Sequence, residues 1–227
     1  ILEKTGDLEG RRAFQEGLFY IQDPASRLAV QALDPQPGMR VLDVCAAPGG
    51  KSFGTAIRME SRGEVISCDL HPHKRKLIQS GAARLGLEII TPMTADGKAF
   101  RPEWEGAFDR VLVDAPCSGL GVIRKKPDIR FKDPEPLKEL PGVQREILSN
   151  AARYVKPGGV LVYSTCTLLR RENEAVALGF LADHPHFKAE GFPLPECVGD
   201  ARTGMLTLWP HRQGTDGFFI CRLRREG

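Results

Sequence analysis

The stretch VLDVCAAPGGKS, residues 41–52, decides the fold of this chain. Its first four residues predict a short buried strand, and its glycines lead into a helix that we expect over residues 50–59. The ending fits the phosphate-binding pattern G-x-x-x-x-G-K-[ST], except that Cys45 stands where the first glycine should be. The stretch is therefore either an altered nucleoside triphosphate loop or an intact loop for another ligand.

A proline decides between these two ligands. A triphosphate loop wraps phosphate with successive backbone N–H groups, but Pro48 in this turn has no N–H to donate. An adenosyl ligand with an amino-acid tail needs only a close backbone approach, which Gly49 and Gly50 permit, and a helix start beside its carboxylate. We therefore favour S-adenosylmethionine, although ATP would explain Lys51 better.

Predicted strands and helices alternate from residue 40 onward. We expect strands over residues 40–44, 64–68, 87–93, 110–113, 160–165 and 216–225, and helices over 50–59, 72–85, 141–154 and 171–182. Short runs of β-branched residues bounded by turns are typical of a parallel sheet that helices cover on both faces. In such sheets ligands bind beyond the carboxyl ends of the strands, where Asp69 and Asp114 are placed.

Asp69 is a candidate for binding the ribose hydroxyls of an adenosyl ligand. It lies 18 residues after Lys51, close to the roughly 20-residue spacing of the dinucleotide fingerprint. The simpler alternative is that Asp69 caps the helix that begins near Pro72. The loop lacks the pattern G-x-G-x-x-G, so a nicotinamide dinucleotide is poorly supported.

The composition is that of an ordinary globular domain, with 41% hydrophobic and 27% charged residues in a chain of 227. The net charge of +3 does not by itself indicate a nucleic-acid partner. No apolar run approaches the roughly 18 residues of a membrane span, and the start, ILEKTGDLEGRR, does not resemble a signal peptide. We expect a cytoplasmic, monomeric protein that does not associate with membranes.

The six cysteines are spread along the chain, at positions 45, 68, 117, 166, 197 and 221. They form no C-x-x-C pair, which argues against structural zinc and a disulfide scaffold and fits a reducing cytosol. We interpret the His-Pro-His triplets 71–73 and 184–186 as loop positions and expect no metal. Cys68, Cys197 and Cys221 are interpreted as small buried hydrophobic residues.

Cys117 and Cys166 differ because each lies in a short polar turn after a predicted strand, in DAPCSG and YSTCTL. If these strands are neighbours, the two thiols share one cleft. A methyl donor beside a thiol suggests methylation of cytosine at carbon 5, since that carbon becomes nucleophilic once a thiolate adds at carbon 6. Such a thiol needs a lowered pKa. Asp114 is placed to bind the Watson–Crick edge of an extruded base.

Three motifs together, CAAPGGK, DAPCSG and STCT, resemble the RNA cytosine-C5 methyltransferases of the Nol1/Nop2/Sun family. Within the family, the resemblance is to bacterial enzymes of small-subunit (16S) ribosomal RNA, and it extends from about Phe19 to the closing DGFF. It implies the class I, Rossmann-like fold of S-adenosylmethionine-dependent methyltransferases, with seven mostly parallel strands and a last antiparallel strand. It also implies an RNA partner.

The resemblance assigns roles to individual residues. Cys166 corresponds to the family's nucleophile, Cys117 to the cysteine that assists release of the methylated product, and Asp114 completes the catalytic set. The residues that match the family's S-adenosylmethionine contacts are Cys45, Ala46, Ala47, Pro48, Gly49, Gly50, Lys51, Asp69, Asp96 and Asp114.

The resemblance also suggests a division of the chain. Residues 1–35 are a lead-in segment that we expect to pack on a methyltransferase domain formed by residues 36–227. The first residue is Ile1 rather than methionine. We therefore expect that the N-terminal RNA-binding domain of the family is absent from this sequence.

The stretch GVIRKKPDIRFK, which follows Cys117, is rich in cations. A solvated loop is the default interpretation, but Phe131 is interleaved with these charges beside the expected cleft, which favours contact with RNA phosphates. The residues expected to make it are Arg124, Lys125, Lys126, Arg130 and Lys132, with Arg11 and Arg12 as an extension. Three further arginines are interpreted as an exposed strand edge: Arg222, Arg224 and Arg225.

Other functions stay open at this point. A P-loop ATPase would explain Lys51 and Asp114 but neither Cys166 nor Pro48. A non-catalytic ribosome-assembly module would have no use for two thiols in one cleft. The RNA could also be a tRNA or another ribosomal RNA. The cysteine roles are open too, because DNA cytosine methyltransferases use a cysteine in a Pro-Cys turn, which here would be Cys117.

Overall fold

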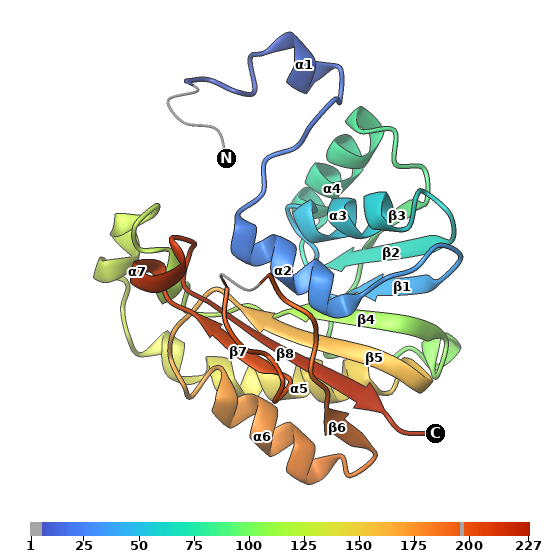
Figure 1. Cartoon of the computed structure of the whole chain (residues 1–227), viewed down its shortest axis with the longest axis vertical. Coiled ribbons are helices and arrows are strands. Elements are labelled where there is room, and N and C mark those ends of the chain that lie inside the picture. Colours follow the sequence, from blue (N-terminus) through green and yellow to red (C-terminus); the bar gives the residue numbers. More distant parts are fainter. Residues whose placement is uncertain (1–5, 196–197) are drawn as a thin grey trace.

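The computed structural model describes residues 6–195 and 198–227, which form an α/β fold around one sheet (Figure 1). The strands are β1 (Arg40–Asp43), β2 (Glu64–Asp69), β3 (Ile90–Thr94), β4 (Phe108–Asp114), β5 (Val155–Thr165), β6 (Phe187–Ala189), β7 (Met205–Leu208) and β8 (Phe218–Arg225). The α-helices are α1 (Arg12–Gln15), α2 (Pro24–Leu33), α3 (Gly50–Arg58), α4 (Pro72–Arg84), α5 (Leu140–Ala152), α6 (Glu174–Asp183) and α7 (Pro210–Gln213). Short 3-10 helices are η1 (Pro102–Trp104), η2 (Leu120–Val122), η3 (Pro127–Phe131) and η4 (Pro136–Lys138).

The sheet begins with five parallel strands in the order β3-β2-β1-β4-β5. β8 then pairs antiparallel with β5, and the other edge of β8 pairs antiparallel with β7 and β6. This arrangement confirms the predicted class I, Rossmann-like fold. The predicted count of seven strands is corrected, since the described residues form an eight-stranded sheet. β6 and β7, with three and four residues, are too short for hydrophobic periodicity to reveal them.

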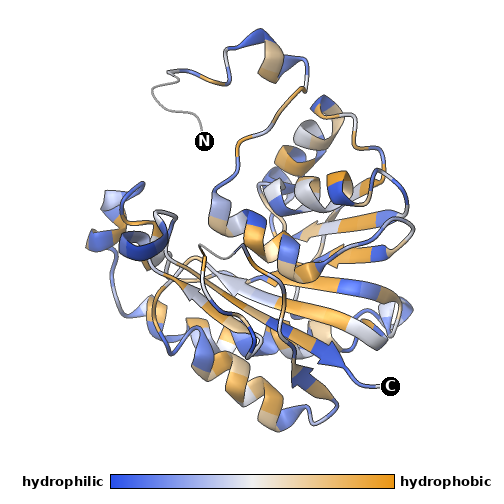
Figure 2. Ribbon diagram, viewed as in Figure 1, coloured by the Kyte–Doolittle hydropathy of each residue, from blue (hydrophilic) through white to orange (hydrophobic). Residues whose placement is uncertain are grey.

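Helices cover both faces of the sheet. α2, α3 and α4 lie on one face, where Leu33, Phe53 and Ile78 join the same apolar core. α5 and α6 lie on the other face, and they contribute Leu148 and Phe180 to its core. Figure 2 shows hydrophobic residues concentrated in the central strands, whereas the C-terminal part of β8 is hydrophilic. The buried central strands are those expected of a parallel sheet between two helical layers.

The lead-in segment contributes α2 to one of these layers. Asp23 accepts a hydrogen bond from Ala25 N–H at 2.9 Å and so caps the helix, while Pro24 occupies the first turn, where its missing N–H costs nothing. Leu28 and Leu33 are buried, and α2 contacts α3, β4, β5 and β8. The core that supports the site therefore includes residues before position 36.

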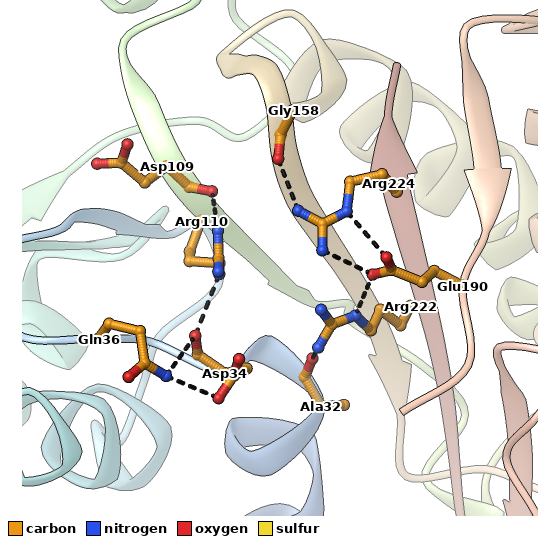
Figure 3. A network of polar contacts seen from close by, with 9 residues as sticks. All are labelled: Ala32, Asp34, Gln36, Asp109, Arg110, Gly158, Glu190, Arg222 and Arg224. Atoms are coloured by element: carbon orange, nitrogen blue, oxygen red, sulfur yellow. Dashed lines mark hydrogen bonds and ion pairs between the residues drawn. The ribbon is translucent and has the colours of Figure 1, made fainter. Parts of the chain in front are cut away.

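The arginines of β8 are not the exposed strand edge that the sequence suggested. Arg222 is 6% exposed, and its guanidinium donates to Glu190 Oε2 at 2.8 Å and to Ala32 O at 2.6 Å. Arg224 binds the same carboxylate (Figure 3), and Arg225 donates to a carbonyl of β5. The prediction was wrong because β8 is an interior strand between β5 and the β6–β7 pair.

Arg110 of β4 attaches the end of α2 to the sheet. Its Nε donates to Asp34 O at 3.2 Å, and its Nη1 donates to Asp109 O at 3.0 Å (Figure 3). Burial lowers the pKa of Arg110, and the neighbouring arginines act in the same direction. A cation at this end of a helix is favourable because the last carbonyls carry partial negative charge.

Three predictions outside the site can be compared with the fold. Within residues 6–195 and 198–227, no helix is long and apolar enough to cross a membrane. In that same part of the chain no group of three or more His, Cys, Asp or Glu side chains could hold a metal ion. Cys68 and Cys221 are buried, which confirms their interpretation, and Cys197 lies outside the described residues.

Candidate active site

The loop between β1 and α3 is shaped by its backbone. Gly49 has a φ of 113°, and a Cβ on it would lie 2.4 Å from a ring atom of Phe53, so only glycine fits. Ser52, in the first turn of α3, donates a hydrogen bond to Asp43 Oδ2 at 2.7 Å. Burial raises the pKa of Asp43 to about 7. The loop is thus fixed to a buried carboxyl at the end of β1.

Lys51 forms an ion pair inside the protein. Its Nζ lies 2.6 Å from Asp114 Oδ2, and Ser164 Oγ donates to the other carboxylate oxygen at 2.7 Å. Burial opposes the charge of Lys51, but Asp114 outweighs it, so the pKa of Lys51 is raised. A lysine held in this way is not extended toward a phosphate. The motif resemblance instead places Lys51 among the S-adenosylmethionine contacts.

The two candidate thiols lie together, as the sequence predicted for neighbouring strands. β4 and β5 are adjacent, and Cys117 Sγ lies 3.3 Å from Cys166 Sγ. A hydrogen bond from the Cys117 thiol lowers the pKa of Cys166, and the charge of Lys51 acts in the same direction. The same hydrogen bond and burial raise the pKa of Cys117. Of the two, Cys166 is therefore the thiol that ionises first.

A buried carboxylate holds the turn that carries Cys117. Glu172 has no solvent exposure, and its Oε2 accepts hydrogen bonds from Ser118 N–H at 2.9 Å and from Gln144 Nε2 at 3.0 Å. Gln144 Nε2 also donates to Pro116 O at 2.9 Å. Cys117 is thus fixed through the residue before it and the residue after it. Sequence reasoning missed Glu172 and Gln144.

A second hydrogen bond joins the two thiol turns to each other. Ser118 Oγ lies 2.7 Å from Thr167 Oγ1, and both side chains are fully buried. Each follows its cysteine directly in the chain. The positions of Cys117 and Cys166 are therefore coupled through their neighbours as well as through their sulfur atoms.

A cavity of about 320 Å³ opens at the carboxyl ends of the parallel strands and contains both thiols. The predicted site residues that line it are Cys45, Ala47, Asp69, Asp96, Asp114, Cys117 and Cys166. The rest of the loop, Ala46 and Pro48 to Lys51, is not part of the lining. Lining residues that the sequence did not predict include Leu70, His71, Lys74, Val143 and Ile147. A larger hollow of about 510 Å³ beside α2 and α3 is lined by neither thiols nor carboxylates.

The lining fits the parts of an adenosyl ligand. Asp69 Oδ1 accepts from His71 N–H at 3.1 Å, and Asp96 Oδ1 accepts from Lys98 N–H at 2.9 Å. In the described part of the chain, the second oxygen of each carboxylate has no hydrogen-bond partner, so each is free to accept from ribose hydroxyls or a ring amine. Leu70 adds an exposed apolar surface against which a ring can pack.

Comparison with known proteins identifies the family of this chain. The sequence model of the family described as 16S rRNA methyltransferase RsmB/F matches residues 30–224. The chain belongs to this family. Its members are S-adenosylmethionine-dependent methyltransferases, in agreement with the fold and with the cavity at the strand ends.

Three known proteins are similar to this RsmB/F chain over most of its length. The probable ribosomal RNA small subunit methyltransferase B of Bacillus subtilis is 49% identical over 98% of this chain and 51% of its own length. The ribosomal RNA small subunit methyltransferase F of an Escherichia coli O6:H1 strain is 40% identical over 92% of this chain and 45% of its own length. NSun6 from Pyrococcus horikoshii, solved with SFG, is 29% identical with a TM-score of 0.84 and covers 97% of this chain and 56% of that chain. The chain thus spans about half the length of these curated relatives.

In this RsmB/F chain, part of the cationic loop after Cys117 binds other residues of the protein. Lys125 Nζ bridges Asp23 and Asp216, and it lies 2.8 Å from Asp216 Oδ2. Burial opposes its charge, but the two carboxylates raise the pKa of Lys125. The other predicted RNA contacts are exposed: Arg124, which donates to Gly214 O, Lys126, Arg130 and Lys132. Lys125 therefore links the loop to the residues that lead into α2 and β8.

Proposed function

We propose that the protein transfers a methyl group from S-adenosylmethionine to carbon 5 of a cytosine in RNA, through a covalent bond between Cys166 and carbon 6. The observation that carries the proposal is the thiol pair, 3.3 Å apart at the carboxyl ends of β4 and β5. Two thiols with opposite pKa shifts suit two different steps of covalent catalysis. A protein that only binds RNA would gain nothing from them.

The residues around the cavity would hold S-adenosylmethionine in two parts. Asp69 and Asp96 would bind the adenosyl part, and the loop from Cys45 to Lys51 would lie against the methionine end, where Gly49 lets the backbone approach. The bound cofactor supplies an electrophilic methyl group. Asp114, which lines the cavity together with Cys45 and the two thiols, would separate the cofactor side from the base.

The protein's own groups would activate and then release the cytosine. The Cys166 thiolate adds to carbon 6, and the electrons of the 5,6 double bond move to carbon 5, which becomes nucleophilic. Asp114 accepts a hydrogen bond from the amino group on the Watson–Crick edge. After methylation, a general base takes the carbon-5 proton, and the electron pair of that C–H bond restores the 5,6 double bond and expels Cys166 as thiolate. Cys117, next to that sulfur, would assist this release.

The RNA is proposed to be 16S ribosomal RNA, because the family is described by this substrate and two relatives carry it in their names. A tRNA or another ribosomal RNA is the alternative within the same chemistry. We expect bisulfite sequencing of RNA from cells that lack the protein to show one cytosine in 16S ribosomal RNA that has lost its modification. Loss of a tRNA modification instead would reassign the substrate.

The two cysteine roles are tested by trapping the adduct. We expect Cys117→Ala to accumulate a covalent protein–RNA complex that denaturing gels detect, and Cys166→Ala to form none and to transfer no methyl group. Cys68→Ala, which removes a buried thiol outside the cavity, is the matched control and should turn over normally. An adduct with Cys166→Ala but not with Cys117→Ala would reverse the roles, and binding of Mg–ATP without response to S-adenosylmethionine would overturn the proposal.

A further inference from the structure

A third hollow, of about 480 Å³, lies between the segments that follow the two cysteines. Leu120 comes three residues after Cys117, and Leu169 comes three residues after Cys166. Both leucines line the hollow. Gly121 N–H donates to Cys166 O at 2.9 Å, so this wall is attached directly to the thiol turn. The hollow is therefore built on the same two loops as the catalytic thiols.

The lining of this hollow combines an apolar floor with a cationic rim. Leu120, Ile129, Pro134, Leu137 and Leu169 supply the apolar part. The rim carries four cations: Arg130, Lys132, Arg170 and Arg171. No acidic side chain lines the hollow, and none of the four cations forms an ion pair within the described residues. Cations without an ion pair around an apolar depression attract a ligand that has both a flat stacking surface and negative charge.

A nucleotide has this combination, since its base presents flat faces that stack on apolar side chains and its backbone carries phosphate. Proteins bind single strands by packing bases on apolar or aromatic side chains while cations follow the backbone. Phe131, between two rim cations, is 82% exposed, and the Arg130 guanidinium lies 5.5 Å from its ring centroid. The RNA chain must also continue on either side of a cytosine that is extruded toward the thiols.

We propose that this hollow is a subsite for a nucleotide that flanks the target cytosine, with its base on the apolar floor and its phosphates on the four rim cations. The inference rests on the proposed function and adds a second contact through which the enzyme reads the RNA around its target. Arg170 and Arg171, which sequence analysis did not include among the RNA contacts, are assigned to it. Because the subsite is attached to both thiol turns, a base seated there fixes the register of the strand.

The test compares two variants of equal charge on an in vitro 16S ribosomal RNA transcript. Arg170→Gln/Arg171→Gln removes half of the rim, and Arg62→Gln/Arg153→Gln removes two exposed arginines before β2 and β5, at the opposite end of the sheet. For the rim variant we expect KM for the transcript to rise about tenfold with kcat within about twofold. For the rim variant, the plot of the logarithm of the RNA-binding constant against the logarithm of the salt concentration should be less steep by about 1.4. The control variant should have the KM of the wild type.

Crosslinking locates the nucleotide directly. With a transcript that contains 4-thiouridine, we expect crosslinks to peptides that include Leu120, Leu137 or Leu169, and we expect Leu137→Ala to weaken them. If the wild type methylates the transcript but the two double variants have equal KM and crosslinks map elsewhere, the subsite is refuted while the proposed function stands. If the wild type does not methylate any RNA, both proposals fail together.

Discussion

Lys51 Nζ lies 2.6 Å from Asp114 Oδ2, and this ion pair acts on the neighbouring thiol of Cys166. Both side chains are largely buried, with 12% and 26% exposure, so their charges are poorly screened by solvent. Asp114 raises the pKa of Cys166 and Lys51 lowers it. The lysine that makes the loop look like an ATP site thus offsets a carboxylate that would otherwise oppose thiolate formation.

Removal of this cation should therefore make Cys166 less reactive. We expect Lys51→Met to raise the pKa of Cys166, which leaves less thiolate near pH 7. The measurement is the pH dependence of iodoacetamide alkylation at Cys166, followed by mass spectrometry. Lys74→Met is the control, because Lys74 lines the same cavity beside Asp69. Equal alkylation profiles for both variants would contradict the electrostatic role of Lys51.

Glu172 should be required for the step that depends on Cys117. Glu172→Ala leaves Ser118 N–H and one N–H of the Gln144 amide without an acceptor, while the amide keeps its bond to Pro116 O; we expect this to cost about 2–4 kcal/mol in urea denaturation. The loosened turn should displace Cys117 and slow product release, so that the covalent RNA complex accumulates as it does in Cys117→Ala.

Glu172→Gln provides the matched comparison for this prediction. The amide keeps one oxygen for both donors and places its NH2 where Glu172 Oε1 now has no partner. We expect a stability within about 1 kcal/mol of the wild type and no accumulation of the adduct. If Glu172→Ala lowers adduct formation and release equally, Glu172 supports the fold without positioning Cys117.

Asp43 should make the stability of the protein decrease as pH rises. Because its pKa in the folded state is about 7, the folded protein keeps a proton that the unfolded chain loses near pH 4. Between these values the folded state binds more protons, so its stability falls with rising pH by up to about 4 kcal/mol. Asp43→Asn removes this term and preserves the acceptor for Ser52. We expect urea denaturation to show that the free energy of unfolding of the variant increases relative to that of the wild type between pH 4 and pH 8. A difference in unfolding free energy that does not change with pH would exclude the titration of Asp43.

Lys125 and Lys126 are adjacent but should respond differently to neutralisation. Lys125→Gln leaves Asp23 and Asp216 facing each other without their shared cation. Since Lys125 is half exposed, we expect a modest fall in Tm of about 2–4 °C. Lys126→Gln removes an exposed charge without an ion pair in the described structure and should leave Tm unchanged. Equal shifts in thermal unfolding would contradict the structural role of Lys125.

Much of this site is local in sequence and could be predicted from it. The buried strand before Cys45, the glycines of the loop and the turns after β4 and β5 place the chemistry at the carboxyl ends of a parallel sheet. The contact of Cys117 with Cys166 also followed, because it needed only that two strands be neighbours. The motif resemblance supplied the roles that spacing alone left open.

Other features depend on contacts between distant segments and left no local signal. Glu172 follows two arginines at the start of a predicted helix, where an exposed acid is expected, yet its partners are Ser118 and Gln144. Lys125 looks like its neighbours in a basic run, and only the approach of α2 and β8 gives it two carboxylates. Arg222 was expected to be exposed because β6 and β7, which cover the edge of β8, are too short to leave a recognisable pattern in the sequence.

The position of β8 has a consequence for how the protein forms on the ribosome. β5 lies between β4 and β8, and 52 residues separate the end of β5 at Thr165 from the start of β8 at Phe218. Until that segment has been synthesised, β5 presents an unpaired apolar edge, which is a template for aggregation. The bond from Arg222 to Ala32 forms at the same late stage. α2, which precedes every strand of the sheet in the sequence, is therefore fastened by β8, which follows the other seven.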